Sequence, residues 1–517
     1  MLTRATRGTA STSQPIQQRQ QRVLLLLPGL VVLLPVAALL VVRRFDGLYG
    51  QDAFAYYDYA VGPLRQSLLA LRVVPPPEFY WPPGFPALVA MASLALGATP
   101  LAAQVVSLLM GTAAAVATAA LTRELFHDEH IGVALLAGGF VAVCAQVWQS
   151  SAVVMSDTTA LACATLGAWA SVRYTRTGDL RWLVLASVAL TWSLLTRWIY
   201  GLAVLPVAVA VIAGLGRLQP RRAALHVLAA VVPGGLLLVW VLVPVLQSAP
   251  GVPQPFIGTL ETYGSEIWRP ANLLLREFQT TGHGVVRYPW PNGVYYAVAL
   301  GHPFMLTPLL SLLAIPGVVL LVRRRAWRAL WLLLGWTVGM YLFHAGSTWQ
   351  NLRYVLAYLP PVAIVAAVGA SRLLQATNPR LMMLARAGIG LGIVWALVGG
   401  PLLTSRFVDQ KNGDLATVEW VQGATEPHAR LLTFGPTLVL RHYGQHEALD
   451  LYDLQPDELP ALLADGRPTY VLLDEANVED QWRGRSPAVN YAWLRDHPGL
   501  EPVGRQAGMS LFRVSQS

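Results

Sequence analysis

The sequence predicts an all-α polytopic membrane protein with about eleven transmembrane helices, an interfacial helix on the outer face and a small C-terminal α/β domain. Three observations predict this fold class. Hydrophobic residues make up 55% of the 517 positions and charged residues only 13%, whereas a soluble domain carries about 25% charged residues. Long apolar runs recur as far as residue 403, and shorter segments typical of a soluble domain replace them after residue 405. A chain with so few charges needs lipid to cover much of its surface.

The N-terminal region combines a polar tail with the first membrane crossing. Residues 1–22 are rich in Ser, Thr, Gln and Arg, which predicts a disordered cytoplasmic tail. Residues 23–42 carry no charge, and as a helix of about 1.5 Å per residue they span the ~30 Å hydrocarbon core. The run is too long for the apolar part of a signal peptide, and no small-residue cleavage site follows it. We therefore expect a transmembrane helix here.

Ten further apolar runs predict the remaining crossings. They lie near residues 101–121, 131–148, 156–172, 182–196, 199–215, 224–247, 303–322, 328–345, 352–371 and 387–403. One additional run, at 83–98, decides the topology, because every later loop changes side if it crosses. As a helix this run measures only ~24 Å, which is short for a membrane span. We expect it to be an interfacial or re-entrant helix on the outer face.

The distribution of arginine supports this topology. If residues 83–98 do not cross and the N-terminus is cytoplasmic, the arginine clusters between the later runs all face the cytoplasm. These residues are Arg123, Arg173, Arg176, Arg181, Arg217, Arg221, Arg222, Arg323, Arg324, Arg325, Arg328, Arg372, Arg380 and Arg386. Cytoplasmic loops carry an excess of positive charge. The sequence pI of 9.7 therefore reflects membrane orientation, and we expect no nucleic-acid partner.

The predicted topology divides the chain into three parts. The tail at 1–22 precedes a transmembrane domain at 23–405, whose two long outer loops are 43–100 and 248–302. Residues 406–517 are expected to form an extracytoplasmic α/β domain, because ARLLTF, EALDLY and PTYVLLD are typical of short strands. The stretches QPDELPALLAD and PAVNYAWLRDH between and after them are typical of helices. Cys144 and Cys163 both fall inside apolar runs, so we expect no disulfide framework.

The first outer loop carries candidate catalytic acids. Its segment FDGLYGQDAFAYYDYA contains Asp46, Asp52 and Asp58 beside several tyrosines. A carboxylate at the membrane surface is suited to removing the proton from an acceptor hydroxyl while a lipid-anchored group leaves. The alternative for Asp46 and Asp58 is a solvated loop carboxylate, and Asp46 follows Arg43 and Arg44, with which it can pair.

A second acid, Asp157, opens an otherwise apolar helix at its outer end. A carboxylate facing lipid at this depth costs a few kcal/mol, so a functional site is one interpretation. The alternative is a helix N-cap, because Ser156-Asp157 precedes a helical run, and the two roles are compatible.

Two arginines also lie at the outer ends of apolar runs. Arg197 stands in LLTRWIYGL and Arg353 in STWQNLRYVLAYLPP. A guanidinium at this depth needs an anionic partner, and a phosphate held by two hydrogen bonds is a natural one. An internal salt bridge to Asp157 or Asp52 is the alternative. Because four ionisable groups at one membrane boundary are costly unless they share partners, we expect these four residues to converge on one outer cavity.

Histidines and aromatic residues extend the candidate site. His344 and His302 flank the same outer face, where a lone histidine is either a packed polar cap or a functional group. The second outer loop holds aromatic and polar residues that suit a sugar or a peptide, or equally an interfacial aromatic belt. These are Glu261, Tyr263, Glu266, Trp268, Arg269, His283, Tyr288, Trp290, Tyr295 and Tyr296. No nucleotide-binding signature is present, which disfavours ATP-driven pumps and enzymes that use soluble nucleotide sugars.

The order of these motifs resembles the C-type glycosyltransferase fold, and specifically the protein O-mannosyltransferase-like enzymes and their bacterial lipopolysaccharide-modifying relatives. The resemblance covers roughly residues 23–403. Its motifs are Asp52, Tyr56 and Ala60 in QDAFAYYDYA, the outer helix FYWPPGFPALVAMASLALG, Asp157 in MSDTTALA, the pair Thr196-Arg197, and Arg353-Tyr354 in RYVLAYLPP. Two features depart from the pattern. Ala53 follows the first acid where the family often has a second one, and the Trp-Trp-Asp signature of oligosaccharyltransferases is missing, which argues against en bloc transfer to asparagine.

The resemblance implies a function and a set of site residues. The donor would be a polyprenyl-phosphate monosaccharide, Asp52 the base, and Asp157 a second catalytic residue that assists positioning. Because Asp52 has the spacing to Tyr56 and Ala60 that the family shows, we predict that Asp46 and Asp58 are dispensable. Arg353 would hold the donor phosphate, and transfer would invert the anomeric centre. The substrate-binding candidates are Tyr56, Arg197, Arg353, Tyr354 and His344. No metal or other cofactor is expected, although the sequence does not exclude a divalent cation.

The acceptor and the competing functions stay open at this point. The acceptor would be a protein, a lipid glycan or a cell-wall polymer, met at the outer face of the cell membrane together with membrane lipid. The main alternative is a transporter or flippase of a lipid-linked or amphipathic substrate, although such proteins often show internal repeats and this chain shows none. A non-catalytic scaffold that presents residues 406–517 is a third possibility.

Overall fold

The computed structural model describes most of the chain. The described residues are 20–21, 23–72, 74–77, 79–215, 219–247, 256–257, 267–280, 284–444, 446–497 and 499–515. Nearly all of the predicted N-terminal tail therefore lies outside the described residues. Part of the second outer loop does so too, including Glu261, Tyr263, Glu266 and His283.

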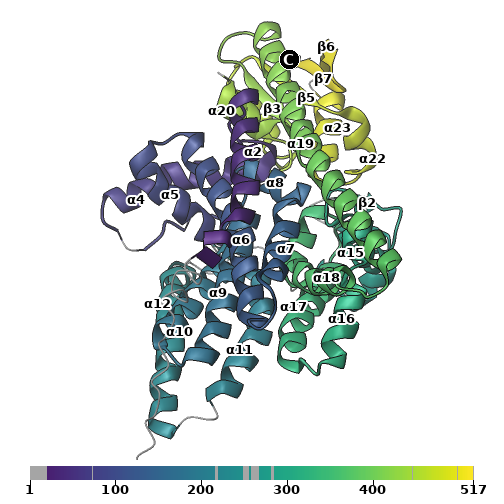
Figure 1. Cartoon of the computed structure of the whole chain (residues 1–517). Helices are drawn as coiled ribbons and strands as arrows, with labels where there is room; N and C mark the ends of the chain where they lie inside the picture. Colours follow the sequence, from purple (N-terminus) through teal and green to yellow (C-terminus); the bar gives the residue numbers. More distant parts are fainter. Residues whose placement is uncertain are drawn as a thin grey trace, which may run out of the picture.

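Helices dominate the structure, and Figure 1 shows them as one elongated bundle with a small domain at one end. The helices that precede this domain are α2 (Leu27–Arg43), α3 (Gly50–Tyr59), η1 (Ala60–Leu64), α4 (Arg65–Leu69), α5 (Gly84–Leu96), α6 (Pro100–Leu125), α7 (Ile131–Ala142), α8 (Ala145–Ala152), α9 (Asp157–Thr177), α10 (Leu180–Thr196), η2 (Trp198–Tyr200), α11 (Gly201–Leu215), α12 (Pro220–Gln247), η4 (Pro270–Leu274), α14 (Asn292–Val298), η5 (Ala299–Gly301), α15 (Thr307–Ser311), α16 (Ala314–Arg323), α17 (Trp327–Gly346), η6 (Leu352–Tyr358), α18 (Leu359–Leu374) and α19 (Pro379–Ala424). A hairpin of β1 (Glu277–Thr280) and β2 (Gly284–Arg287) interrupts them in the second outer loop. Each of the eleven predicted runs coincides with a helix or with two consecutive helices.

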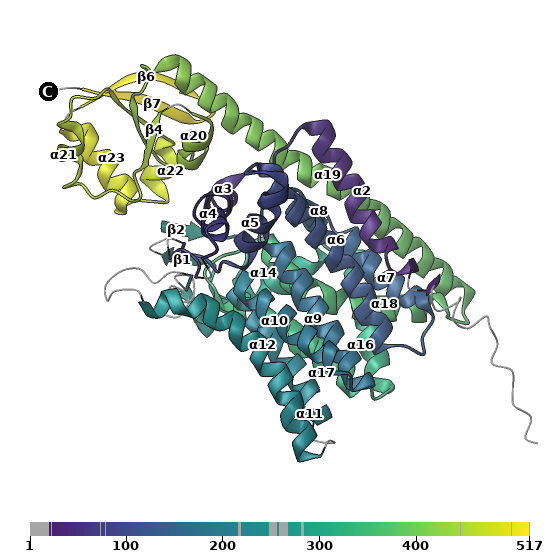
Figure 2. The ribbon, with the colours of Figure 1, turned by 90° about the vertical axis from the view of Figure 1, so that its left-hand side faces the viewer.

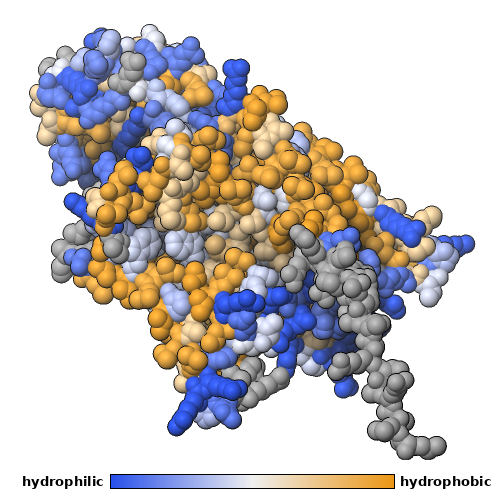
Figure 3. Space-filling model, turned by 60° about the vertical axis from the view of Figure 1, so that its left-hand side comes forward, coloured by the Kyte–Doolittle hydropathy of each residue, from blue (hydrophilic) through white to orange (hydrophobic). Residues whose placement is uncertain are grey.

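The apolar surface of the bundle is that of a membrane protein. Figure 3 shows hydrophobic side chains across the middle of the face in view, with hydrophilic side chains on the C-terminal domain and at the opposite end. Within the described residues, α6, α12, α17, η6–α18 and α19 are long and apolar enough to cross a membrane, and the bent pair α7–α8 adds a sixth candidate. The fold class is confirmed, whereas the number of eleven crossings stays a prediction.

The segment at 83–98 folds as the short helix α5. Its thirteen residues reach only ~20 Å, less than the hydrocarbon core. The helix packs against the end of α10, where a Cβ atom on Gly84 would lie 2.6 Å from Thr196 Oγ1 and 2.7 Å from the carbonyl oxygen of Leu195. Only glycine allows this close approach.

The interfacial placement expected for α5 leads to a testable prediction about membrane sides. We expect cysteines introduced at Asp128, between α6 and α7, and at Thr177, at the end of α9, to resist a membrane-impermeant reagent in intact cells. A cysteine at Asp457, in the C-terminal domain, should react. Background labelling should be low because Cys144 is buried and Cys163 is only partly accessible. Labelling at both positions 128 and 177 in intact cells would contradict the topology.

The longest helix, α19, joins the bundle to the C-terminal domain. It runs without a break for 46 residues, so the predicted domain boundary at 405/406 falls inside this helix. Figure 2 shows it passing beside α2 and leaving the bundle to end at the domain. Beyond the apolar part, Val408, Lys411, Val418 and Val421 are buried at spacings of three and seven, so one face of the helix stays packed. The folded sheet begins only at Arg430.

The C-terminal domain is an α/β domain, as the sequence predicted, but its mixed sheet has five strands, and the sequence analysis named only the first three of them along the chain. Its elements are β3 (Arg430–Thr433), α20 (Thr437–Tyr443), β4 (Glu447–Asp450), α21 (Leu459–Leu463), β5 (Thr469–Leu473), α22 (Glu475–Asp480), α23 (Ser486–Asp496), β6 (Leu500–Gln506) and β7 (Met509–Val514). The strand order is β4-β3-β5-β7-β6; β3 pairs in parallel with β4 and β5, and β7 pairs antiparallel with β5 and β6. All five residues of β5 are buried, which is typical of a central strand.

Candidate functional site

Asp52 and Arg353 form the first of two ion pairs at the candidate site. Asp52 lies in the first turn of α3, and Arg353 lies in η6, 301 residues further along the chain. One guanidinium nitrogen of Arg353 donates to Asp52 Oδ2 at 2.7 Å, and the other donates to Met155 Sδ at 3.2 Å. The two side chains are 31% and 17% exposed. Of the two candidate acids, Asp52 is therefore the one that an incoming substrate can reach.

Asp157 and Arg197 form the second ion pair, beside the first. Asp157 opens α9, where the positive end of the helix dipole stabilises a carboxylate. Arg197 ends α10 in an extended conformation and donates to Asp157 Oδ1. The carboxylate is only 5% exposed. The capping interpretation is not supported, because neither Ser156 nor Asp157 makes a side-chain cap bond at this helix end.

An aromatic ring joins the two ion pairs. The guanidinium groups of Arg197 and Arg353 each lie 5.4 Å from the ring centroid of Tyr354. His344, at the end of α17, stacks on the same ring at 5.1 Å. The four ionisable residues therefore lie together in one cluster with Tyr354 and His344. That this cluster opens into an outer cavity stays a prediction. Cation–π contacts of this kind are worth more where water is excluded.

Tyr56 lines the cluster from α3, one turn after Asp52. Its hydroxyl bonds to Ser156 at 3.1 Å, and its ring packs against Phe79, Trp81 and Phe85. Burial raises the pKa of Tyr56 to about 12, so the phenol stays protonated and acts as a hydrogen-bond donor or acceptor. Phe79 and Trp81 come from the Pro-rich segment before α5 and Phe85 from the first turn of α5, so this part of the chain packs against the candidate site.

Several buried polar atoms of the cluster have no partner among the described residues. They are Asp157 Oδ2, His344 Nε2 and Arg353 Nε. Buried polar atoms are nearly always hydrogen-bonded in folded proteins, and leaving one unsatisfied costs about 1–3 kcal/mol. A set of donors and acceptors in one place is therefore suited to a polar ligand or to ordered water.

The structure separates the three acids of the first outer loop. Asp58 is 56% exposed and lies 3.9 Å from His442, so it is largely solvated and does not join the cluster. Asp46 pairs with Lys411 at 2.5 Å, while Arg43 pairs with Asp409. The expected pairing of Asp46 with Arg43 or Arg44 is therefore wrong. Lys411 is the only lysine of the chain, and its sequence position carried no signal of this contact.

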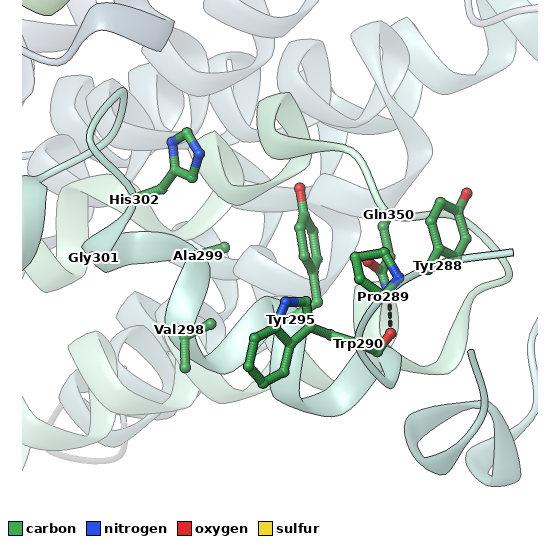
Figure 4. Close-up of a pocket in the computed structure, with 9 residues that line it drawn as sticks. All are labelled: Tyr288, Pro289, Trp290, Tyr295, Val298, Ala299, Gly301, His302 and Gln350. Carbon is green, nitrogen blue, oxygen red and sulfur yellow. Dashed lines mark hydrogen bonds between the residues drawn. The ribbon is translucent and has the colours of Figure 1, made fainter.

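A cavity of about 500 Å³ lies near the ion-pair cluster. It is formed by the second outer loop and the loop before η6. Its lining residues are Tyr288, Pro289, Trp290, Tyr295, Val298, Ala299, Gly301, His302 and Gln350. Figure 4 shows the rings of Trp290, Tyr295 and Tyr288 around it, with Gln350 hydrogen-bonded to the carbonyl oxygen of Trp290 at 2.5 Å. None of the residues predicted to be catalytic or substrate-binding lines this cavity, whereas its lining includes four of the residues expected to extend the site, Tyr288, Trp290, Tyr295 and His302. It joins the ion-pair cluster through rings in contact, from Tyr295 to Tyr296 and on to His344.

Metal binding has no obvious place in the described part of the chain. No group of three or more His, Cys, Asp or Glu side chains lies close enough there to hold an ion. The prediction that no metal is needed stays a prediction.

Comparisons with solved structures show the fold. ArnT from Cupriavidus metallidurans in the apo state superposes with a TM-score of 0.59 at 13% identity, covering 94% of this chain and 98% of that one. ArnT bound to undecaprenyl phosphate gives a TM-score of 0.56 at 13% identity over 98% and 99% of the two chains. The archaeal oligosaccharyltransferase AglB from Archaeoglobus fulgidus, in complex with an inhibitory peptide and a dolichol-phosphate, gives 0.56 at 12% identity over 98% of this chain and 75% of that one.

The chain is a membrane protein with the C-type glycosyltransferase fold, and the resemblance stated from its motifs is confirmed at this level. Within that class, residues 81–246 match the model of the dolichyl-phosphate-mannose-protein mannosyltransferase family. The matched segment includes Asp157 and Arg197 and ends at α12. A search of the curated proteins finds no match.

Proposed function

We propose that the protein transfers a monosaccharide from a polyprenyl-phosphate donor to an acceptor outside the cytoplasm. The observation that carries the proposal is the Asp52–Arg353 pair beside the Asp157–Arg197 pair in a bundle of this fold. A reachable carboxylate next to a guanidinium provides both groups that the reaction needs. The likeness to ArnT bound to undecaprenyl phosphate supports a lipid-phosphate donor.

The proposed reaction is a single displacement at the anomeric carbon. Asp52 accepts the proton of the acceptor hydroxyl as its oxygen bonds to the sugar. The bond between the sugar and the phosphate oxygen breaks, and the polyprenyl phosphate leaves with the electron pair. Arg353 hydrogen-bonds the phosphate and neutralises its charge, while Asp157 keeps Arg197 in place beside it. Attack opposite to the leaving group inverts the anomeric centre.

The test is sugar transfer in detergent from a radiolabelled polyprenyl-phosphate monosaccharide to envelope glycans or proteins. Turnover by the wild type, and its loss in an Asp52→Ala variant that folds and inserts normally, would support an enzyme. A transporter or flippase would move the lipid-linked sugar across a vesicle membrane without forming a new glycosidic bond. That result would contradict the proposal.

The aromatic cavity is proposed to take part of the prenyl chain of the donor. Its walls are aromatic and aliphatic, and the lining side chain of Val298 is 60% exposed, as expected where lipid covers the surface. Trp290 is itself 56% exposed, so it contributes only part of its area to any ligand. We expect the contact between Trp290 and the prenyl chain to contribute about 1 kcal/mol, which corresponds to about fivefold in affinity.

We therefore expect Trp290→Ala to raise the KM for a long-chain donor about fivefold with little change in kcat. The KM for a donor with a short, water-soluble prenyl chain should not change, because that chain does not reach the cavity. Trp327→Ala is the matched control, since Trp327 is 59% exposed and lies at the start of α17, at the opposite end of that helix from the loop that carries Gln350. An equal rise in KM for both donors would contradict a role of Trp290 in binding the prenyl chain.

A further inference from the structure

A buried ionic node joins three distant parts of the chain outside the candidate site. We define this node by Asp46, Lys411 and Tyr443. Lys411 Nζ donates to Asp46 Oδ1 at 2.5 Å and to the Tyr443 hydroxyl at 2.5 Å, and that hydroxyl donates to Asp46 Oδ2 at 2.5 Å. Lys411 also donates to the carbonyl oxygen of Leu48 at 2.8 Å. All three protons of the ammonium group therefore have acceptors.

Lys411 is buried in the node, beside its charge partner Asp46. The Lys411 side chain is only 4% exposed, and the pKa of Lys411 is lowered by burial, partly offset by Asp46. A buried charge is tolerated only with good geometry and further hydrogen bonds, and removing one partner leaves the other uncompensated. We therefore expect the node to fix the position of the segment around Asp46 rather than to add much to the free energy of unfolding.

The segment that the node holds leads directly into the helix that carries Asp52. The carbonyl oxygen of Phe45 accepts from Gln104 Nε2 of α6 at 2.9 Å. The carbonyl oxygen of Gly47 accepts from the amide of Val154 at 2.9 Å. Residues 45–48 are thus held from α6, from the α8–α9 loop and from α19. Asp52 follows four residues after Leu48, within the first turn of α3.

The C-terminal domain also packs on the side of α3. The His442 ring of α20 lies 5.4 Å from Phe54 and 5.7 Å from Tyr57, and the Tyr443 ring lies 6.0 Å from Phe54. Phe54 is fully buried by this contact and its surroundings. Figure 2 shows α3 on the side of the bundle that faces the C-terminal domain. The domain therefore contacts both the start of α3 and its flank.

The domain meets the second outer loop as well. The amide of Val285 in β2 donates to the carbonyl oxygen of Gln481 at 2.8 Å. A Cβ atom on Gly284 would lie 2.1 Å from that same oxygen, so the hairpin and the domain are in direct contact. The domain is therefore supported on both outer loops rather than attached by α19 alone.

We infer that Asp46, Lys411 and Tyr443 are positioning residues, through which the C-terminal domain holds α3 so that Asp52 faces Arg353. This inference rests on the proposed function and deepens it, because it assigns the domain a part in the same reaction. It also replaces the expectation that Asp46 is dispensable, because Asp46 would act on the position of α3 and not on the proton of the acceptor. Without the node, α3 keeps its fold but not a single position relative to η6. A misplacement of about 1 Å at a reacting group lowers the rate by about 10²-fold.

The chain offers a matched control for this idea. Arg43 and Asp409 form a second ion pair between the end of α2 and α19, two residues before Lys411 on the same helix. The Asp409 side chain is 65% exposed, and surface pairs contribute little. Asp46→Asn and Asp409→Asn each remove one carboxylate that ties the same two segments, but only the first is in the node.

The experiment measures kcat, the donor KM and hydrogen exchange of the backbone amides of residues 50–60 in the purified full chain. For Asp46→Asn and Tyr443→Phe we expect kcat to fall about 10- to 100-fold with the donor KM within about twofold, and the α3 amides to exchange faster. Asp409→Asn should match the wild type in all three. Tyr443→Phe keeps the ring that packs on Phe54, so it tests the node if Asp46→Asn does not fold.

Two outcomes would overturn the inference. One is an unchanged kcat and unchanged exchange in the node variants. The other is an equal loss in Asp409→Asn, which would mean that any tether between these segments is enough. If the wild type transfers no sugar at all, the proposed function fails, and the exchange rates of α3 still decide whether the node orders this helix.

Discussion

Replacing Asp52 by asparagine is expected to lower sugar transfer by about 10²–10⁴-fold, the usual loss when a general base is removed. The amide keeps the size of the side chain and a hydrogen-bonding oxygen, but it cannot accept the acceptor proton. It also removes the charge that pairs with Arg353 at 2.7 Å. The measurement is the initial rate from a polyprenyl-phosphate donor in detergent, with the melting temperature as a check of folding.

Asp58→Asn is the control for this prediction. Asp58 lies on the same helix, is 56% exposed and lies 3.9 Å from His442. Burial raises the pKa of Asp58, and His442 lowers it, yet nothing connects this carboxylate with the ion-pair cluster. Turnover should stay near that of the wild type. Near-normal turnover in Asp52→Asn, or a collapse in Asp58→Asn alone, would show that the catalytic carboxylate lies elsewhere.

Replacing Arg353 by glutamine is expected to have the second-largest effect. Truncating one partner of a hydrogen-bonded, largely buried charge pair costs about 2–5 kcal/mol, or about 30- to 5,000-fold in kcat/KM. The loss has two parts, because Asp52 loses its partner and the donor phosphate loses its hydrogen bonds. We expect the donor KM to rise and kcat to fall, measured over a range of donor concentrations.

Arg287→Gln serves as the matched control for Arg353. Arg287 lies on the outer hairpin, is 69% exposed and pairs with Glu277 at the surface. Exposed pairs of this kind typically contribute about 0–1 kcal/mol. An Arg353→Gln variant that binds and turns over the donor as well as Arg287→Gln would refute the phosphate-binding role.

The helices were largely predictable because each carries its own signal. Long apolar runs are needed wherever a chain meets lipid, so composition alone located the helices of the bundle. The strands at 430–433, 447–450 and 469–473 were predictable for a similar local reason, since compact apolar segments alternate there with turns. The continuation of α19 to Ala424 was not predicted, because its polar surface after residue 403 is typical of a soluble segment.

The candidate site was predictable only in part. Asp52, Asp157, Arg197 and Arg353 stood out because a charge next to an apolar run is costly and therefore unusual. The sequence led us to expect that they converge, but it did not show which acid pairs with which arginine. The node was missed, since Asp46 had nearer arginines in the sequence and Lys411 lay in a polar stretch with no motif around it.

By itself the sequence determined that this protein is a bundle of apolar helices with a C-terminal α/β domain, and which few charged residues at its outer side are exceptional. Both follow from local composition, which can be read from each segment of the sequence without knowing its neighbours in space. Only the tertiary structure decided that Asp52 pairs with Arg353 across 301 positions, Asp157 with Arg197 across 40, and Asp46 with Lys411 across 365. Such pairs depend on how whole helices pack against one another. A charged side chain pairs with the opposite charge that packing places within a few ångströms of it, and that residue need not be near in the sequence.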